Sequence, residues 1–551
     1  MSDKVIVLGG GVAGMSAAHE LVEAGFEVEV YESKSIPGGK ARSVAVPDSS
    51  AGDRKSLPGE HGFRFFPRFY KHITDTMRRI PYGDNRQGVY DNLVDTTRIQ
   101  MARYGQPHVN LVSRCPRSLT DFKQIFTDLF DTDIGVSDDD IQFFGEKVWQ
   151  IMTSCEERRL DEYEKIGWWD FIGAPSRSQA YQHLFGYGLT RSLVAAKANL
   201  ASTKTVGDIF VQLLFDVLEP GVSSDRVLNG PTNKVWIEPW LDYLRLKGVR
   251  YHLDAQVMSI NCKGEVITGV TINERGAVSE KTGDYYISAL PVEVMSGLIN
   301  DDLLQADPSL ANIKTLAPNV SWMNGIQFYL TEDVEVVHGH VLYIDAPWAL
   351  TSVSQHQFWR DVDLTEYGDG EVKGILSVDV SEWTRPGISG KTAMQCTRDE
   401  IKDEIWAQLK MSLNVDGKEE LTDEHLHSWF LDPDIVFFKD PHDPDPTKKD
   451  NKEPLLVNLV DTWHLRPCAF TRIPNLFLAS DYVQTFTDLA TMEGANEAAR
   501  RAVNCIIDAS GSRAAYCAIW KLHEPEVFEP WRAHDRSRWQ KGLPWNGKMW
   551  N

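Results

Sequence analysis

The chain has 551 residues, with 57 Lys and Arg against 79 Asp and Glu, so its net charge is −22 near neutral pH. Such an acidic chain is a poor partner for nucleic acid or an anionic membrane surface, because its field repels phosphate groups. The length exceeds one ordinary hydrophobic core, so we expect two or three domains. A hydrophobic share of 42% and a charged share of 25% are typical of globular proteins.

Cysteine usage and hydropathy point to a cytoplasmic protein. Seven cysteines are scattered, without a Cys-x-x-Cys pair, at positions 115, 155, 262, 396, 468, 505 and 517. This pattern indicates reduced thiols, and neither a disulfide framework nor a metal site. No run of 18 apolar residues is present, and an apolar strand starts at Lys4, which leaves no room for a leader peptide. Peripheral membrane contact through an apolar patch and pairing with a second copy both stay open.

The first 32 residues carry a dinucleotide-binding pattern. The apolar run Lys4–Leu8 predicts a buried parallel strand. Gly9, Gly11 and Gly14 follow it as G-x-G-x-x-G, which permits a tight turn and the close approach of a pyrophosphate. The apolar spacing over residues 15–25 predicts a helix whose N-terminus favours phosphate. A second strand, 28–32, ends in Glu32, whose carboxylate can hold a ribose hydroxyl and favours FAD or NAD over NADP.

A second glycine turn, Pro37-Gly-Gly-Lys-Ala-Arg-Ser43, comes directly after this unit. It resembles the extended FAD fingerprint of the flavin amine oxidase and phytoene desaturase superfamily. The Gly-Gly-Lys form is closer to the plant-type carotene desaturases, and the whole chain is nearest the branch of carotenoid desaturases and hydroxysqualene dehydroxylase-like proteins. The resemblance implies FAD as cofactor and an FAD-dependent oxidoreductase.

A third stretch is rich in aromatic residues. It runs Gly59-Glu-His-Gly-Phe-Arg-Phe-Phe-Pro-Arg-Phe-Tyr70 and leads into a helix through Ile80. The resemblance implies that this segment passes the flavin ring, with Glu60 and His61 as candidate catalytic groups. The alternative is an aromatic core cluster in which His61 is an ordinary hydrogen-bonded residue.

The C-terminal part carries the closing motif of the same superfamily. Residues 475–481 predict a strand that ends in Asp481, and Thr491-Met-Glu-Gly-Ala495 opens a helix aimed at the flavin. A positive helix end there stabilises negative charge on reduced flavin. Where the family usually has a glycine before the acid, this chain has Ser480.

The resemblance, taken with the two glycine turns, predicts a set of cofactor-binding residues. They are Gly9, Gly11, Val12, Ala13, Gly14, Glu32, Ser33, Gly38, Gly39, Lys40, Ala41, Arg42, Gly62, Phe63, Arg64, Val257, Ala289, Asp481, Thr491, Met492, Glu493 and Ala495. In this set the backbone of Val257 is expected to receive the adenine.

The order of motifs predicts an α/β fold: a Rossmann-type, GR2-like FAD-binding domain on a parallel sheet, with an α+β substrate domain that contains a helical insertion. The expected division is 1–110, 226–295 and 461–510 for the FAD-binding domain, 111–225 for the helical insertion, 296–460 for the mixed substrate sheet, and 511–551 for a Trp-rich tail. The tail lacks its own periodicity, and we expect it to wrap the FAD domain or a partner chain. The charged, proline-rich segment 432–454 is expected to be a solvated loop.

Apolar spacing predicts further elements within these domains. Helices are expected over 119–130, 139–155, 163–171, 179–200 and 205–218 in the insertion, and over 397–413 in the substrate domain. Strands are expected over 250–260 in the FAD-binding domain and over 322–330, 340–344 and 374–380 in the substrate domain.

One departure from the family bears on the reaction. Amine oxidases of the superfamily usually carry a lysine on the strand that matches residues 321–330, and the alignment places Asn324 there. The favoured hypothesis is therefore hydride transfer from a lipophilic, isoprenoid- or carotenoid-like substrate to flavin N5. It predicts an apolar tunnel with few charged groups at the flavin.

Two alternatives remain. One is oxidation of an amine or amino-acid-derived molecule with O2 as acceptor, which predicts an aromatic cage from Trp463, Phe486 or Phe65. The other is a flavoprotein without net redox turnover. The substrate, the electron acceptor and any proton-transfer residue are not determined by these motifs.

Overall fold

The structure, a computed structural model, describes residues 2–112, 135–188, 200–218, 223, 225–438 and 445–550. Its organising element is a five-stranded parallel sheet in the order β23-β13-β1-β2-β9. The strands come from distant parts of the chain: β1 (Lys4–Leu8), β2 (Glu27–Tyr31), β9 (Arg250–His252), β13 (Tyr285–Ser288) and β23 (Leu476–Leu478). This arrangement confirms the predicted Rossmann-type domain.

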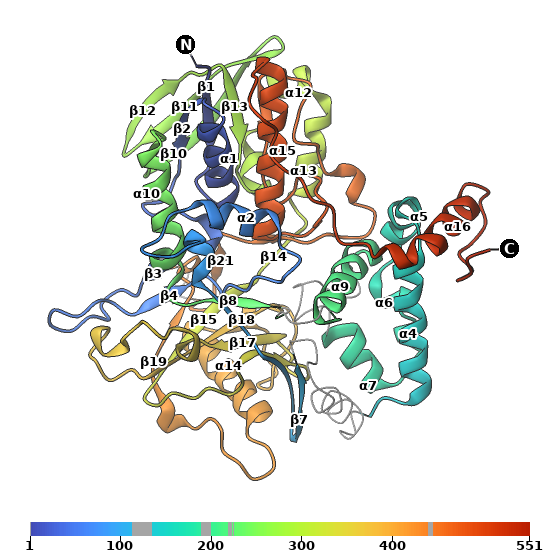
Figure 1. The fold of residues 1–551 in the computed structure, drawn as a ribbon. Helices are drawn as coiled ribbons and strands as arrows, with labels where there is room; N and C mark the ends of the chain where they lie inside the picture. The colour runs from blue at the N-terminus through green and yellow to red at the C-terminus, as the bar shows by residue number, and fades with distance from the viewer. Residues whose placement is uncertain are drawn as a thin grey trace.

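Helices pack against this sheet and close its core. Helix α1 (Val12–Glu23) and helix α15 (Met492–Ser510) lie side by side, with α2 (His72–Arg79) across their lower ends and α10 (Glu238–Leu246) beside α1 (Figure 1). Helix α1 begins at Val12, inside the glycine motif and before the predicted start at residue 15. Three short helices follow β13: α11 (Val292–Leu298), α12 (Asp301–Ala306) and α13 (Ala311–Leu316).

One strand prediction is wrong. The sequence predicts a single strand over 250–260, but the chain turns at Asp254, which has a positive φ of 55°. The part before the turn is β9 of the parallel sheet. The part after it, β10 (Ala255–Lys263), pairs with β11 (Val266–Glu274), which pairs with β12 (Ala277–Lys281), in a separate antiparallel sheet. Apolar residues of that sheet share the core of the FAD-binding domain.

The substrate domain is built on a seven-stranded sheet, in the order β19-β15-β18-β17-β16-β6-β7. Its strands are β6 (Arg98–Arg103), β7 (Gln106–Val112), β15 (Asn324–Leu330), β16 (Gly339–Tyr343), β17 (Leu350–Ser354), β18 (Gly374–Val380) and β19 (Leu426–Leu431). Helix α14 (Arg398–Leu413) packs on this sheet through a buried apolar cluster. Because β6 and β7 complete this sheet, the expected segment 1–110 contributes to both domains.

A helical insertion stands beside the two sheets (Figure 1). Its helices are α4 (Asp138–Thr153), α5 (Glu156–Asp161), α6 (Trp168–Phe171), α7 (Gln179–Tyr181), followed by a π-helical turn (Gln182–Gly188), and α9 (Thr203–Leu218). Aromatic side chains fill its core. The helix expected over 119–130 lies outside the described residues. Within the described ranges, no helix is both long enough and apolar enough to cross a membrane.

The C-terminal segment differs from the expectation of a tail without periodicity. It leaves α15, passes α2, and forms helix α16 (Glu529–Trp539), which packs on α4 and α5 of the insertion (Figure 1). The guanidinium of Arg158 on α5 meets the carboxylate of Asp535 on α16 at 3.0 Å, and both side chains are buried. The tail therefore connects the FAD-binding domain to the helical insertion.

Short ladders occupy several of the connections. They are β3 (Ser43–Ala45) with β4 (Pro58–Glu60), β5 (Leu93–Asp95) with β8 (Arg226–Leu228), β14 (Val320–Ser321) with β22 (Leu455–Leu456), and β20 (Ile435–Phe437) with β21 (Lys449–Asn451).

Candidate cofactor and active site

The first glycine turn has no room for side chains. Gly9 has a φ of +99°, and a Cβ on Gly14 would lie 1.9 Å from the carbonyl oxygen of Gly9. Gly11, the N-cap of α1, offers no side-chain cap, and the first turn of the helix, which contains Val12 and Ala13, carries no acidic residue. Its amide groups are therefore left for an anion, as a pyrophosphate site requires.

Glu32 lies at the carboxyl end of β2, buried beside this turn. Its carboxylate accepts hydrogen bonds from the backbone N–H of Gly10 at 2.7 Å and of Lys34 at 2.8 Å, and from the Ser33 hydroxyl at 3.2 Å. The Tyr251 hydroxyl donates to the Gly10 carbonyl at 2.7 Å. These contacts fix the carboxylate of Glu32 just past β2, and its contact with a ribose hydroxyl stays a prediction.

The second glycine turn closes on the first. Gly38 forms a bridge with Gly11, and a Cβ on Gly39 would lie 2.9 Å from the Cα of Gly11. The two cations that follow turn toward the substrate domain. Lys40 donates from its ammonium group to the carbonyl of Pro454, and Arg42 pairs with Asp434 and Glu453. Any contact of Lys40 and Arg42 with the cofactor stays a prediction.

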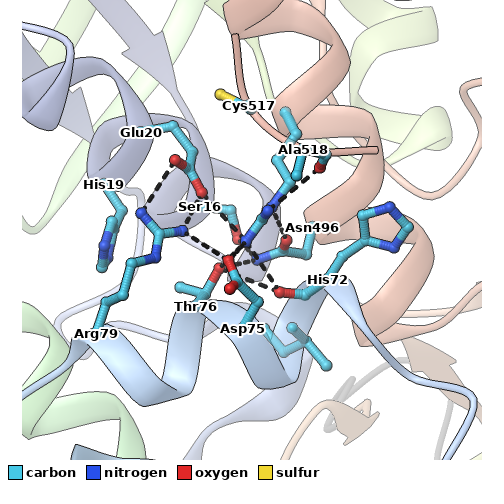
Figure 2. A network of polar contacts seen from close by, with 12 residues as sticks. Ser16, His19, Glu20, His72, Asp75, Thr76, Arg79, Asn496, Cys517 and Ala518 are labelled. Atoms are coloured by element: carbon cyan, nitrogen blue, oxygen red, sulfur yellow. Dashed lines mark hydrogen bonds and ion pairs between the residues drawn. The ribbon is translucent and has the colours of Figure 1, made fainter. Parts of the chain in front are cut away.

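The helices behind the glycine turn are joined by a buried polar network (Figure 2). Asn496 of α15 donates to the hydroxyls of Ser16 on α1 at 2.7 Å and Thr76 on α2 at 3.0 Å. Glu493 accepts from the backbone N–H groups of residues 71, 72 and 73 and contacts the His72 ring at 2.7 Å. The carboxylate of Glu493 therefore holds the N-terminus of α2.

Other predicted cofactor-binding residues come from α15, from the ends of β13 and β23, and from β10. Thr491 caps α15, accepting at 3.1 Å from the N–H of Gly494, and Met492 and Ala495 lie in the first turn of that helix. The carbonyl of Ala289, just past β13, would lie 2.9 Å from a Cβ on Gly9. Val257 is buried in β10, and the backbone carbonyl of Asp481 accepts a hydrogen bond from Arg466.

The segment 60–64 brings His61 to a carboxylate. Its Nδ1 lies 2.7 Å from Oδ2 of Asp432, and the same carboxylate accepts from the amide of Asn324 on β15. Asn451 in turn donates to the Asn324 carbonyl oxygen at 2.9 Å. Burial alone raises the pKa of Asp432, but the ion-pair contact with His61 and the hydrogen bond from Asn324 hold it below the usual value. His61 is itself buried, and among the described residues its Nε2 has no hydrogen-bond partner, while its Nδ1 makes the ion-pair contact with Asp432.

The expectation of a solvated loop over 432–454 is therefore wrong within the part of that segment that the structure describes. Asp432, Asp434 and Glu453 are buried. Burial alone raises the pKa of Glu453, but the charges of Arg42 and His61 lower it to about 2. His61, Asp432 and Asp434 are close enough to share a metal ion, but Arg42 already pairs with Asp434. The guanidinium of Arg42 neutralises the charge of Asp434. We therefore describe His61, Asp432, Asp434 and Arg42 as a cluster of ion pairs.

The segment 60–64 also contributes to a second cluster of charged residues, formed by Glu60, Arg64 and Asp379. Burial raises the pKa of both Glu60 and Asp379 to about 7, and it lowers the pKa of Arg64 near them. Glu60 accepts from Thr232, and Arg64 donates to the carbonyl of Gly62 at 2.6 Å. A Cβ on Gly62 would lie 2.6 Å from Asp379. Near pH 7 both acids are therefore close to half protonated.

The three aromatic residues expected to form a cage lie in different surroundings. Phe65 and Phe63 pack on His340, with ring centroids 5.0 and 5.3 Å away. The Trp463 ring lies 4.1 Å from the ammonium of Lys204, and the Phe486 ring lies 4.7 Å from the guanidinium of Arg501. No ring contact joins Phe65, Trp463 and Phe486 in the described part of the chain.

Sequence reasoning missed Asp379, Asp432 and Lys204. Asp379 had a detectable signal, since a lone acid within the apolar strand 374–380 is unusual. Lys204 pairs at 2.7 Å with Asp488, a buried residue with a positive φ of 43°. No local pattern announces the pairing of residues from α9 and the loop before α15.

The parallel sheet, the glycine turn and the acid after β2 define a dinucleotide-binding protein. The chain belongs to the flavin-containing amine oxidoreductase family, whose model matches residues 12–507. As a member of that family it is a flavin-dependent oxidoreductase, with FAD as its cofactor.

Relatives and solved structures agree with this assignment. A zeta-carotene desaturase from Synechocystis sp. is 23% identical over 311 residues, which are 54% of this chain and 60% of that protein. A carotenoid phi-ring synthase from Chlorobaculum tepidum is 40% identical over 68 residues, 12% of this chain and 10% of that one. The chain thus matches less than two thirds of these curated relatives. A cyclohexylamine oxidase from Brevibacterium oxydans has a TM-score of 0.59 at 11% identity, over 93% of this chain and 100% of that one, which shows a shared fold.

Proposed function

We propose that this protein dehydrogenates a lipophilic substrate of the isoprenoid or carotenoid class. The observation that carries the proposal is the residue at the lysine position of amine oxidases. Asn324 is buried in β15, and its amide is hydrogen-bonded to Asp432 and Asn451. Strand β15 has no lysine anywhere in Asn324–Leu330. The partial likeness to zeta-carotene desaturases supports the same reading.

A small apolar cluster lies on the strands of the substrate sheet. Met101, Val109 and Leu342 form a buried cluster on β6, β7 and β16, with Leu184 and Ile344 packed against it. In the proposed reaction an apolar substrate would gain free energy from the removal of its own surface from water on binding beside such side chains.

The expectation of few charged groups is not met in the segment that is expected to face the flavin. Glu60, Arg64, Asp379 and His61 interact there through their charges. The raised pKa of the two acids limits the ionic charge near neutral pH. We propose that the reacting carbon of an otherwise apolar substrate lies close to these titratable side chains, which can accept a proton.

Bound FAD supplies a hydride acceptor, and the chain supplies position, exclusion of water and proton transfer. In the proposed reaction the substrate loses a hydride and a proton from adjacent carbons to form a double bond. His61 in its neutral form is the proposed proton acceptor, through Nε2, which has no hydrogen-bond partner in the described part of the chain. Asp432, at 2.7 Å, holds the other ring nitrogen and stabilises the imidazolium that forms. The N-terminus of α15 favours negative charge at the cofactor.

Amine oxidation is the second candidate. The Trp463 ring lies 4.1 Å from the ammonium of Lys204, and a substrate ammonium would have to take the place of Lys204 at this aromatic ring. A flavin-dependent L-tryptophan oxidase from Lentzea aerocolonigenes is 38% identical over 78 residues, 14% of this chain and 15% of that protein.

Anaerobic mixing separates the two. The purified holoprotein is mixed with a panel of polyenes and isoprenoids, and separately with a panel of amines, while flavin absorbance near ~450 nm is followed. Bleaching by the lipophilic panel alone supports dehydrogenation. Bleaching by amines, with peroxide released on admission of air, would favour the oxidase and contradict the proposal.

A further inference from the structure

A cavity of about 400 Å³ lies beside α2, outside the predicted cofactor and catalytic residues. One wall is a side of α2, another comes from the β5–β8 ladder, and Trp520 of the C-terminal segment forms a third. Cavities of this size are those that usually take small ligands.

Cationic side chains from different parts of the chain line this cavity: Arg68, Lys71, Arg78 and Arg226. Among the described residues, no carboxylate pairs with the last three of them. Arg226 is only 8% exposed, and its guanidinium donates to neutral acceptors alone. These are the Tyr90 hydroxyl at 2.8 Å and the carbonyls of residues 66 and 67. None of these acceptors carries a charge, and a buried guanidinium with neutral hydrogen-bond partners favours the binding of an anion.

Two carboxylates also line the cavity, those of Asp75 and Asp95, and both have interactions of their own. Asp75 accepts from Arg500 at 2.6 Å and lies 3.4 Å from Arg79, so it is committed to the network behind the glycine turn (Figure 2). Four cations against two acids give the cavity an excess of positive charge in a chain whose net charge is −22. A positively charged cavity in a negatively charged protein raises the local concentration of an anionic ligand.

The aromatic walls of the cavity are held in place. The guanidinium of Arg78 lies 3.7 Å from the ring centroid of Tyr90, and that of Arg226 lies 5.5 Å from the same ring. Trp520 is fixed by a hydrogen bond from its backbone N–H to Nε2 of His72, at 3.0 Å, and by an edge contact with the His72 ring. The cavity thus presents cations and flat aromatic surface together.

We infer that this cavity binds a phosphate-bearing ligand, with a phosphate monoester or diphosphate group at Lys71, Arg78 and Arg226 and its organic part against Tyr90 and Trp520. Guanidinium groups match phosphate oxygens in pairs, and an ammonium group adds a mobile point charge. The ligand could be a soluble phosphorylated compound or a lipid headgroup, since both offer the same chemistry. The inference is independent of the proposed dehydrogenation.

Calorimetric titration of the FAD-bound protein with inorganic pyrophosphate, at low ionic strength, tests this inference without any turnover. We expect one saturable site. Lys71→Gln and Arg78→Gln, both changes of exposed residues, should each weaken binding about tenfold, which corresponds to one charge-assisted contact. The matched controls Lys314→Gln and Arg360→Gln remove exposed cations elsewhere and should leave the affinity unchanged.

Sedimentation with vesicles of phosphatidic acid and phosphatidylcholine distinguishes the two sources. Vesicle binding that is lost in Arg78→Gln and displaced by pyrophosphate identifies a lipid headgroup, whereas pyrophosphate binding without vesicle binding identifies a soluble ligand. Absence of saturable binding to either probe overturns the inference, and so does equal affinity in the cavity variants and the controls.

Discussion

Nδ1 of His61 lies 2.7 Å from Oδ2 of Asp432, although the two residues come from distant parts of the chain. His61 follows the β3–β4 ladder of the cofactor domain, and Asp432 follows β19 of the substrate sheet. The contact therefore bridges the two domains at the segment expected to face the flavin. The position of His61, the proposed proton acceptor, therefore depends on how the two domains are packed together.

Replacing the carboxylate tests this relationship. Asp432→Asn should lower the rate of flavin reduction by about 10²-fold, because His61 loses the group that orients it and stabilises its charged form. The pH dependence of the rate should shift as well, while FAD content stays the same. Stopped-flow reduction across pH measures both, and Asp450→Asn, in the same segment with a side chain that is 46% exposed, is the control. An unchanged pH profile would mean that Asp432 has only a structural role.

The raised pKa of Asp379 predicts how stability depends on pH. Its pKa is about 7 in the fold against 3.8 ordinarily, so the folded state binds the extra proton between these values. Stability is therefore lost as the pH rises from about 4 toward 7, and the full cost, up to about 4 kcal/mol, applies above pH 7. Asp379→Asn should remove this cost and raise the melting temperature at pH 8 much more than at pH 4.

Thermal unfolding of the FAD-bound protein at the two pH values gives the comparison. Asp361→Asn, at an exposed position, should show no such difference. A melting temperature of Asp379→Asn that changes equally at both pH values would contradict the assignment of the raised pKa.

The tight packing of the glycine turn predicts that one added methyl group at Gly14 reduces the amount of bound FAD. A Cβ on Gly14 would lie 1.9 Å from the Gly9 carbonyl, so Gly14→Ala must displace α1 from β1. We expect flavin absorbance per protein to fall by about tenfold or more, since the pyrophosphate site depends on that close packing. Gly145→Ala in α4, where no atom lies within 4 Å of the added Cβ, should retain full FAD content. Normal FAD content in Gly14→Ala would remove the steric argument.

The C-terminal segment should stabilise the helical insertion. Asp535→Ala removes the buried carboxylate from Arg158 and leaves it, within the described chain, only the more exposed carboxylate of Glu162, at an expected cost of about 2–3 kcal/mol. Hydrogen exchange should rise in α4, α5 and α16 but not in α1, because the pair joins the tail to the insertion only. Glu526→Ala, at an exposed position of the same tail, is the control. Exchange that rises evenly across the chain would instead indicate loss of the whole fold.

Most elements of the FAD-binding domain could be predicted from local features of the sequence. The strand Lys4–Leu8, the glycines that follow and the helix after them are determined by neighbours in the chain, through apolar periodicity and the absence of Cβ atoms. Strand β18 occupies the predicted range Gly374–Val380, and α14 begins beside its cap, Thr397, for the same reason. The limits of α1 and the break at Asp254 were less well predicted, because they depend on which sheet each strand joins.

The tertiary structure alone decided the charge environment of the site. In the sequence, Asp432, Asp434 and Glu453 stand among prolines and charges, and the same composition is typical of a solvated loop. Only the approach of Arg42, Lys34 and His61 from the cofactor domain makes their burial favourable, since a buried carboxylate needs an opposite charge close by. Periodicity reports on the face that a residue presents, whereas ion pairing depends on contacts between segments far apart in the chain. The sequence by itself therefore determined the first strand, the glycine turn and the helix that follows it. The contacts around His61 were determined by the tertiary structure.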